Sequence, residues 1–225
     1  MCVDRFFENP TEVRDLALSL PMSNKPPDSM SGLRTKRLLG IDDELTDSIA
    51  QKILSCYFDS PVRYNRADML FNKVPNISAQ EDSYQHQGLT YHDGGPEYTK
   101  LAGVVYLTPD INLDAGTSLF KLKKGERYYK QGHGIDPDYE EIRSTYHSGD
   151  YPPEMEQKHR AWNNRFEETL RFQNVYNRMV CYDGREFRRA NNRYSNVDPR
   201  LTLSFFISGI ICDTLPLVRL KMGVR

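Results

Sequence analysis

The stretch Ala102-Gly-Val-Val-Tyr-Leu-Thr108 is a nearly continuous apolar run that stops at Pro109. A short apolar run of this kind is expected for a β-strand that is covered on both faces. A second run, Arg200-Leu-Thr-Leu-Ser-Phe-Phe-Ile207, has a similar character, and we expect it to be the partner of the first across a β-barrel. The polar turn Gly88-Leu-Thr-Tyr-His-Asp93 leads into the first run and carries side chains that can bind a metal.

Further strands and helices are expected on both sides of these two runs. Asn9, Pro10 and Glu12 form a helix start, with a capping residue, a proline at the first helical position and an acid in the first turn. The predicted helices cover residues 10–20, 46–58 and 153–174. The predicted strands cover residues 64–74 at a sheet edge, a short segment after Gly116, 177–182 and 200–211. Residues 185–199 are expected to form a long polar loop.

Length and charge limit the classes of function. The chain has 225 residues, enough for one large domain, and we expect a single domain over 1–225. Its 30 basic and 31 acidic residues give a net charge of -1, so nothing global favours nucleic acid or an anionic membrane as a partner. Without an apolar leader, a long apolar span or paired cysteine spacings, the sequence predicts a cytoplasmic protein rather than a secreted or membrane one.

The order of several segments resembles that of the Fe(II)/2-oxoglutarate-dependent oxygenase superfamily, and specifically a prolyl-hydroxylase-like group common in marine bacteria and their phages. The segments are Asp4–Arg14, Gly32–Thr35, Ala102–Pro109 with Asp114–Ser118, Asn177–Gly184 and Arg200–Phe206. The resemblance implies an α+β, mainly β fold. Its core would be a double-stranded β-helix, a jelly-roll barrel with the N-terminal helices packed on one face, interrupted by an excursion and a helix at about 121–176.

The same resemblance identifies the positions at which such a protein holds iron. Members place a His-x-Asp just before the first core strand and a second histidine just after the strand that here ends at Tyr182. Aligned without gaps, Asp93 matches the carboxylate, whereas Tyr91 and Arg188 stand where the two histidines are expected. An arginine cannot ligate a metal, because its guanidinium stays protonated and has no free lone pair. The metal triad is therefore expected to be altered.

Two rearrangements would restore a histidine ligand. His92 could replace the first histidine if a bulge shifted the strand, since adjacent strand residues otherwise face opposite sides. His133 or His147 could fold over the barrel mouth and supply the second, although a surface or capping role is the better expectation for both. His159 is expected to face solvent on its predicted helix.

The residues implied for anion binding match the resemblance better than those implied for metal binding. Arg200 and Thr202 are two residues apart and so face the same way along a strand. A forked guanidinium beside a hydroxyl is suited to a carboxylate. The resemblance assigns Arg200 to the distal carboxylate of 2-oxoglutarate and Tyr106 to a co-substrate contact. A structural ion pair for Arg200 and a core phenol for Tyr106 are equally compatible with the sequence.

Three functions follow from these patterns. The first is a non-catalytic binding or structural module that keeps an anion pocket, with protein partners in an assembly such as a virion. The second is an active Fe(II)/2-oxoglutarate-dependent hydroxylase whose rearranged triad uses His92, Asp93 and another histidine. The third, nucleic-acid binding through the loop of Arg185, Arg188, Arg189 and Arg193, has the least support.

Overall fold

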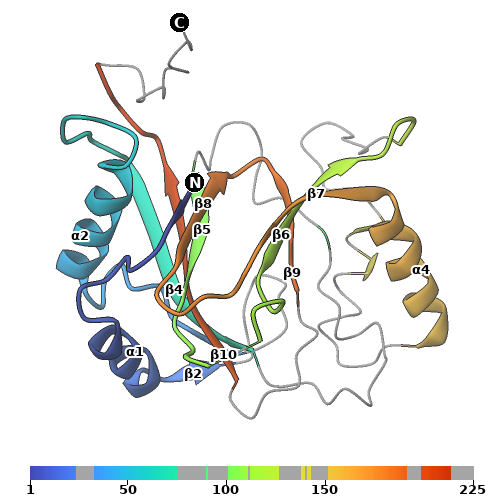
Figure 1. Ribbon diagram of the computed structural model, residues 1–225, viewed down its shortest axis with the longest axis horizontal. Coiled ribbons are helices and arrows are strands. Elements are labelled where there is room, and N and C mark those ends of the chain that lie inside the picture. Colours follow the sequence, from blue (N-terminus) through green and yellow to red (C-terminus); the bar gives the residue numbers. More distant parts are fainter. Residues whose placement is uncertain are drawn as a thin grey trace, which may run out of the picture.

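The computed structural model describes residues 1–23, 33–74, 90, 101–110, 112–126, 138–139, 141–142, 152–191 and 199–213. Two antiparallel sheets dominate these residues (Figure 1). The seven-stranded sheet has the order β1 (Cys2–Val3), β8 (Met179–Asp183), β5 (Leu101–Tyr106), β10 (Arg200–Ser208), β4 (Arg66–Val74), β3 (Leu33–Thr35) and β2 (Met22–Ser23). The three-stranded sheet has the order β7 (Phe166–Phe172), β6 (Thr117–Leu122) and β9 (Phe187–Ala190).

The chain moves back and forth between the two sheets. After β5 in the large sheet it forms β6 and β7 in the small one, returns for β8, crosses again for β9 and ends with β10. The predicted class, α+β and mainly β with a jelly-roll core, is confirmed. Helices α1 (Pro10–Ser19) and α2 (Asp43–Leu54) cover one face of the large sheet, as Figure 1 shows.

Strand β10 lies at the centre of the large sheet. It pairs with β5 on one side, where Thr202 faces Tyr106, and with β4 on the other, where Thr202 faces Asn72. The two apolar runs are partners as predicted, but they pair directly as neighbouring strands of one sheet and not across the barrel. The prediction that β4 is an edge strand was wrong, because β3 pairs with its outer side at Asn72 and Lys73. Pro75 does follow its last residue, Val74.

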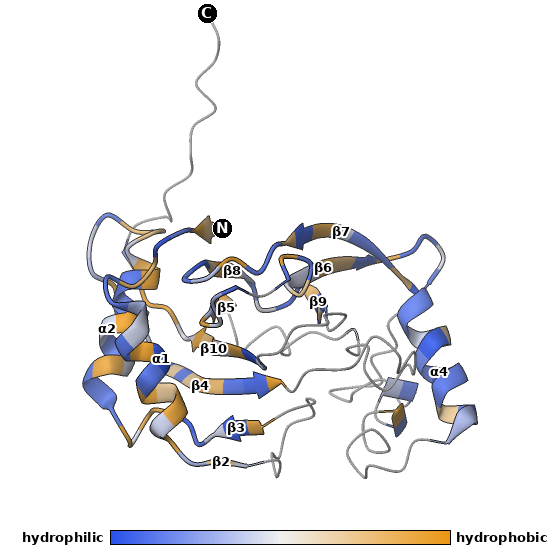
Figure 2. Cartoon of the chain, turned by 60° about the horizontal axis from the view of Figure 1, so that its bottom comes forward, coloured by the Kyte–Doolittle hydropathy of each residue, from blue (hydrophilic) through white to orange (hydrophobic). Residues whose placement is uncertain are grey.

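The two faces of the large sheet differ in character. The face toward α1 and α2 is a continuous apolar core, formed by alternate residues of the central strands: Ala67, Met69, Phe71, Val105, Met179, Cys181, Leu201, Leu203, Phe205 and Ile207. The other face, here called the inner face, is turned toward the small sheet and packs Ala102, Val104, Tyr106, Val180 and Tyr182 against Leu119 of β6. In Figure 2, β4 carries both apolar and polar residues, coloured orange and blue.

The two N-terminal helices begin close to where the sequence predicts. α1 has Pro10 in its first turn, but Asn9 at the cap position makes no side-chain capping bond. α2 begins three residues before the predicted 46, because the Asp42 carboxylate accepts a hydrogen bond from the Leu45 N–H at 2.9 Å and caps the helix there. Its last residue is Leu54.

Two segments were predicted with the wrong secondary structure. The helix expected over 153–174 is α4 (Pro153–Asn164) followed by strand β7. Leu170, which lies in the segment predicted to be helical, is 47% exposed, and the β7 backbone pairs with β6 instead. The polar loop expected at 185–199 contains β9, which pairs with the other side of β6. The arginines of β9 gave this segment a polar sequence typical of a loop, although Arg188 is buried in the strand.

No helix within the described residues combines the length and apolar character needed to cross a membrane.

Candidate functional site

The residues predicted to bind an anion lie together on the inner face. Arg200 and Thr202 are alternate residues of β10, and Thr202 lies beside Tyr106 of β5 in the sheet register. Thr117, from β6 of the small sheet, bonds with both the Tyr106 hydroxyl (2.9 Å) and Arg200 Nη2 (3.4 Å). The site therefore joins the two sheets, and Thr117 is a member that sequence reasoning did not identify.

Arg200 is a buried cation with few partners. It is only 3% exposed, and its guanidinium lies 5.4 Å from the centre of the Tyr106 ring. Its Nε has no hydrogen-bond partner in the described part of the chain, and the 3.4 Å contact with Thr117 is long. Among the described residues no carboxylate forms an ion pair with it. Since buried charges are normally paired, this arrangement favours an anionic ligand.

Tyr106 is also enclosed. Its ring is fully buried, and burial raises the pKa of its hydroxyl, an effect that the charge of Arg200 partly opposes. The phenol is therefore neutral at physiological pH and can donate a hydrogen bond.

Arg188 is the second buried arginine of the inner face. It lies on β9, is 5% exposed, and donates a hydrogen bond from Nη1 to the Tyr182 hydroxyl at 2.5 Å. Its guanidinium also lies over the rings of Tyr182 and Phe206, at 5.6 and 5.3 Å from their centres. These contacts are of the cation–π kind. The side chain thus points between the sheets rather than into solvent.

The predicted metal ligands cannot be placed. Tyr91, His92 and Asp93 lie outside the described residues, as do His133 and His147, so their roles stay predictions. Within the described part of the chain, no three His, Cys, Asp or Glu side chains come together as a metal-binding group.

Thr90, the residue before Tyr91, is described and is held tightly by α4. Its N–H and its hydroxyl both donate to Oδ1 of Asn163, at 3.0 and 2.9 Å, and its carbonyl accepts from Nε1 of Trp162 at 2.8 Å. Thr90 is fully buried. The helix therefore fixes Thr90, which lies three residues before Asp93 in the sequence. Trp162 lies in the segment predicted to be helical, but its contact with Thr90 was not predicted.

His159 is fully buried, so the prediction that it faces solvent was wrong. It lies four residues after Met155 and four before Asn163, both of which are buried on the same side of α4. This i, i+4 spacing was visible in the sequence and places all three on one helix face.

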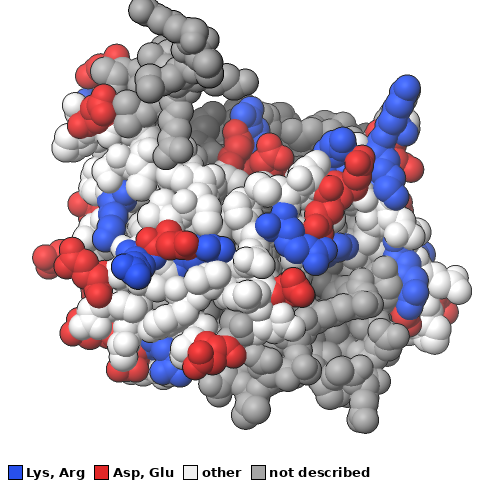
Figure 3. Space-filling view, in the orientation of Figure 1, with Lys and Arg blue, Asp and Glu red and all other residues white. Residues whose placement is uncertain are grey.

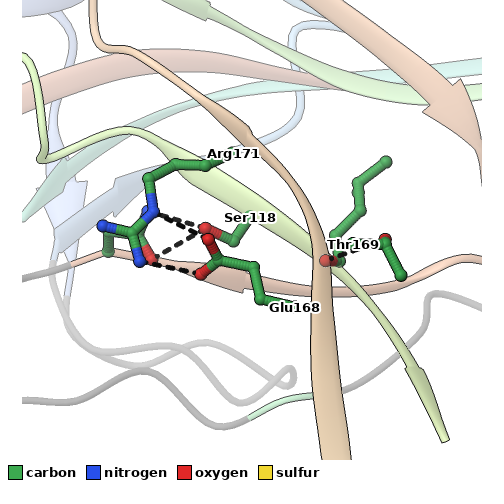
Figure 4. A network of polar contacts seen from close by, with 6 residues as sticks. Ser118, Glu168, Thr169 and Arg171 are labelled. Carbon is green, nitrogen blue, oxygen red and sulfur yellow. Dashed lines mark hydrogen bonds and ion pairs between the residues drawn. The ribbon is translucent and has the colours of Figure 1, made fainter.

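The polar contacts on the outer side of the small sheet are structural. Arg171 donates two hydrogen bonds to the Glu168 carboxylate, at 2.9 and 2.8 Å, and these bonds lower the pKa of that carboxyl (Figure 4). Thr169 donates to the Leu119 carbonyl at 3.2 Å. Ser118 belongs to the same network. These side chains form hydrogen bonds with one another and with the strand backbone.

The arginines of the supposed nucleic-acid loop do not form an open basic strip where they are described. Arg185 is paired with Asp183, Arg188 is buried, and Arg189 stacks over the Phe120 ring at 4.6 Å. On the face shown in Figure 3, acidic and basic side chains are interspersed.

Fold and site together define a jelly-roll protein with a poorly paired buried arginine between its sheets. The chain belongs to a family of unknown function, DUF6445, which it matches over residues 1–207. No curated protein matches the chain significantly.

Several solved structures are similar in fold. A prolyl hydroxylase from Trichoplax adhaerens, solved in complex with a hypoxia inducible factor peptide fragment, has a TM-score of 0.49 at 9% identity, covering 93% of this chain and 83% of its own. A prolyl-4-hydroxylase from Pseudomonas putida has a TM-score of 0.42 at 12% identity, covering 92% and 91%. HygX from Streptomyces hygroscopicus, solved with nickel and 2-oxoglutarate, has a TM-score of 0.45 at 11% identity, covering 92% and 82%.

Proposed function

We propose that this protein is an oxygenase-like jelly roll that binds a small carboxylate anion between its sheets and does not catalyse oxygen chemistry. The observation that carries the proposal is Arg200, whose guanidinium is buried, faces the small sheet and lacks an anionic partner among the described residues. Removing a charge from water without a partner is costly, so a site built this way is completed by a ligand of opposite charge.

A carboxylate suits the groups around Arg200. The guanidinium presents a planar fork of N–H donors that matches two carboxylate oxygens. Thr202, the next residue of β10 on the same face, adds a hydroxyl. The Tyr106 phenol donates its hydrogen to Thr117 Oγ1, which leaves the Thr117 hydroxyl hydrogen as a further donor. The sequence resemblance names 2-oxoglutarate as the dicarboxylate to test first.

Arg188 is the reason for proposing that the protein is not catalytic. The resemblance places this residue where a histidine ligand is expected, and its guanidinium is buried and bound to Tyr182 on the inner face. A guanidinium cannot donate a lone pair to a metal. At about 4 Å it would also repel a divalent ion by roughly 8 kcal/mol, taking about 4 kcal/mol per unit charge pair at an effective dielectric near 20. Membership of an assembly such as a virion stays a prediction.

Thermal shift with 2-oxoglutarate tests the anion site. The native protein is expected to melt at a higher temperature as the anion concentration rises. Arg200→Leu should abolish this shift. Arg171→Leu is the matched control, because that arginine lies at the outer side of the small sheet with Glu168, and it should keep the shift. An unchanged shift in Arg200→Leu would disprove the assignment.

Anaerobic titration with Fe(II) and 2-oxoglutarate tests the absence of catalysis. The proposal predicts no metal-to-ligand absorption band and no succinate release. A band that appears in the native protein and disappears in Asp93→Ala would instead establish the hydroxylase with a rearranged triad, in which His92 and Asp93 bind the iron.

A further inference from the structure

A second unpaired polar atom lies on the inner face beside the arginine site. Asn72 of β4 is 8% exposed, and its Nδ2 donates to the Ser204 hydroxyl at 2.6 Å. Its Oδ1 is buried and has no hydrogen-bond partner among the residues that the structure describes. Sequence reasoning gave neither Asn72 nor Ser204 a role, since both lie in strands that were read as structural.

Asn72 is placed to contact the same ligand as Arg200. It faces Thr202 in the register of β4 and β10, and Arg200 is two residues before Thr202 on the same face. Arg200 and Asn72 are therefore diagonal neighbours, with Cα atoms about 7–8 Å apart, a distance that long side chains can bridge. No hydrogen bond joins the two side chains, although, within the described ranges, one has an unpaired donor and the other an unpaired acceptor. A single small molecule between them would satisfy both.

The two atoms require different groups on that molecule. The Nε of Arg200 is a donor and is completed by a carboxylate, whereas Oδ1 of Asn72 is an acceptor and is completed by a hydroxyl or amino hydrogen. The bond from Nδ2 to Ser204 holds the amide with Oδ1 as its free atom.

We infer that the anion bound at Arg200 is a hydroxy acid, a small carboxylate that carries a hydroxyl donor, and that Asn72 selects it. The inference rests on the proposed anion site and specifies its ligand class. A carbonyl in place of the hydroxyl would present an acceptor to the acceptor Oδ1, so an oxo acid should bind less tightly than the corresponding hydroxy acid.

Calorimetric titration of the full chain with two matched pairs of anions tests the inference. The pairs are 2-hydroxyglutarate with glutarate, and malate with succinate, which differ only by the hydroxyl and cover two chain lengths. In at least one pair the hydroxylated member should bind about tenfold more tightly, as expected for one added hydrogen bond that satisfies a buried acceptor. Equal affinities within both pairs would overturn the inference.

Asn72→Leu, of similar size and without the amide, should reduce that preference to about onefold while the unsubstituted anion still binds. Asn174→Leu is the matched control: Asn174 is also buried with an unpaired Oδ1, but it lies between β7 and β8 and bonds to the Ala115 carbonyl. It should keep the preference.

If Asn72→Leu does not fold, Ser204→Ala replaces it, because it removes the bond that orients the amide and should weaken the preference. A preference that persists in the folded Asn72→Leu or Ser204→Ala variant would overturn the inference. Failure of the anion site itself has a different signature: no member of either pair binds, and Arg200→Leu changes nothing.

Discussion

The two faces of strand β10 present different kinds of side chain, although they belong to the same strand. Toward the helices it presents Leu201, Leu203, Phe205 and Ile207, all 3% exposed or less and packed against α1, α2 and the neighbouring strands. Toward the small sheet it presents Arg200, Thr202, Ser204 and Phe206. Burial is similar on both faces, but only one of them is apolar.

This comparison distinguishes the residues that stabilise the fold from those that are placed to bind a ligand. Burying the apolar side chains provides the main driving force for the sheet and its helices. The polar side chains of the inner face are also buried, yet Nε of Arg200 and Oδ1 of Asn72 find no partner among the described residues. Each unpaired buried group costs about 1–3 kcal/mol. A surface that lowers stability in this way is typical of a binding site and not of a core.

The largest contrast is expected between two adjacent residues of β10. Leu203→Ala should lower the free energy of unfolding by about 2–5 kcal/mol, because it leaves a cavity in the apolar core, and should not change anion affinity in the folded protein. Thr202→Val, next to it on the inner face, should change stability by less than about 1 kcal/mol and weaken anion binding. Urea denaturation and calorimetry measure the two effects. A large loss of affinity in Leu203→Ala would remove the distinction between the faces.

The apolar face also contains a group that should make stability depend on alkaline pH. Burial raises the pKa of the Cys181 thiol from 9.0 to about 11. Between these values the unfolded chain releases the proton and the folded chain keeps it, so stability is full below pH 9 and falls as the pH rises toward 11. The loss should reach about 2–3 kcal/mol.

Urea denaturation at several pH values under reducing conditions measures this effect. Cys181→Ala is the control. The buried tyrosines remain in both proteins, and the pKa of Tyr57, which Cys181 also raises, is raised mainly by burial. The same alkaline slope in Cys181→Ala and the native chain would contradict the assignment.

On the inner face, a substitution that removes function should increase stability. Arg200→Leu replaces a buried, poorly paired cation with an apolar side chain, and the free energy of unfolding should rise by about 1–3 kcal/mol in the absence of anion. Chemical denaturation of the variant and the native protein in anion-free buffer measures the change. A clear loss of stability would show that Arg200 is a structural residue, the alternative that the sequence left open.

The smallest effect is expected at the outer side of the small sheet. Hydrogen bonds from Arg171 lower the pKa of Glu168 in the folded protein. Their contribution to the free energy of unfolding is therefore fully present above the pKa that Glu168 has in the unfolded chain. It is lost as the pH falls through the lower pKa that Glu168 has in the folded protein. Because both side chains are partly exposed, Glu168→Gln should cost less than about 1 kcal/mol at pH 7 and nothing at pH 2. A cost that persists at pH 2 would show that the effect is not electrostatic.

The sequence predicted the parts of the fold that depend on local pattern. The apolar runs of β5 and β10, the first two helices and the stop at Pro75 all follow from periodicity and from residues that start or end elements. β7 and β9 were missed because their pairing with β6 is not local, and because the charged residues of both strands conceal any alternation.

The candidate site was predicted in part for the same reason. Arg200 and Thr202 are two residues apart, so a strand brings them to one face, and Tyr106 was reached through the resemblance. Thr117 and Asn72 come from other strands, and only the three-dimensional register shows that they belong to the site. The positions of Tyr91, His92 and Asp93 lie outside the described residues.

The affinity of the native protein for 2-oxoglutarate, measured by calorimetry once with excess chelator and once anaerobically with Fe(II), is the most direct test of a metal-independent anion site. The account predicts saturable binding with the same dissociation constant in both conditions. Binding that occurs only with Fe(II) would contradict it and would show that the metal, rather than Arg200 and its neighbours, holds the anion.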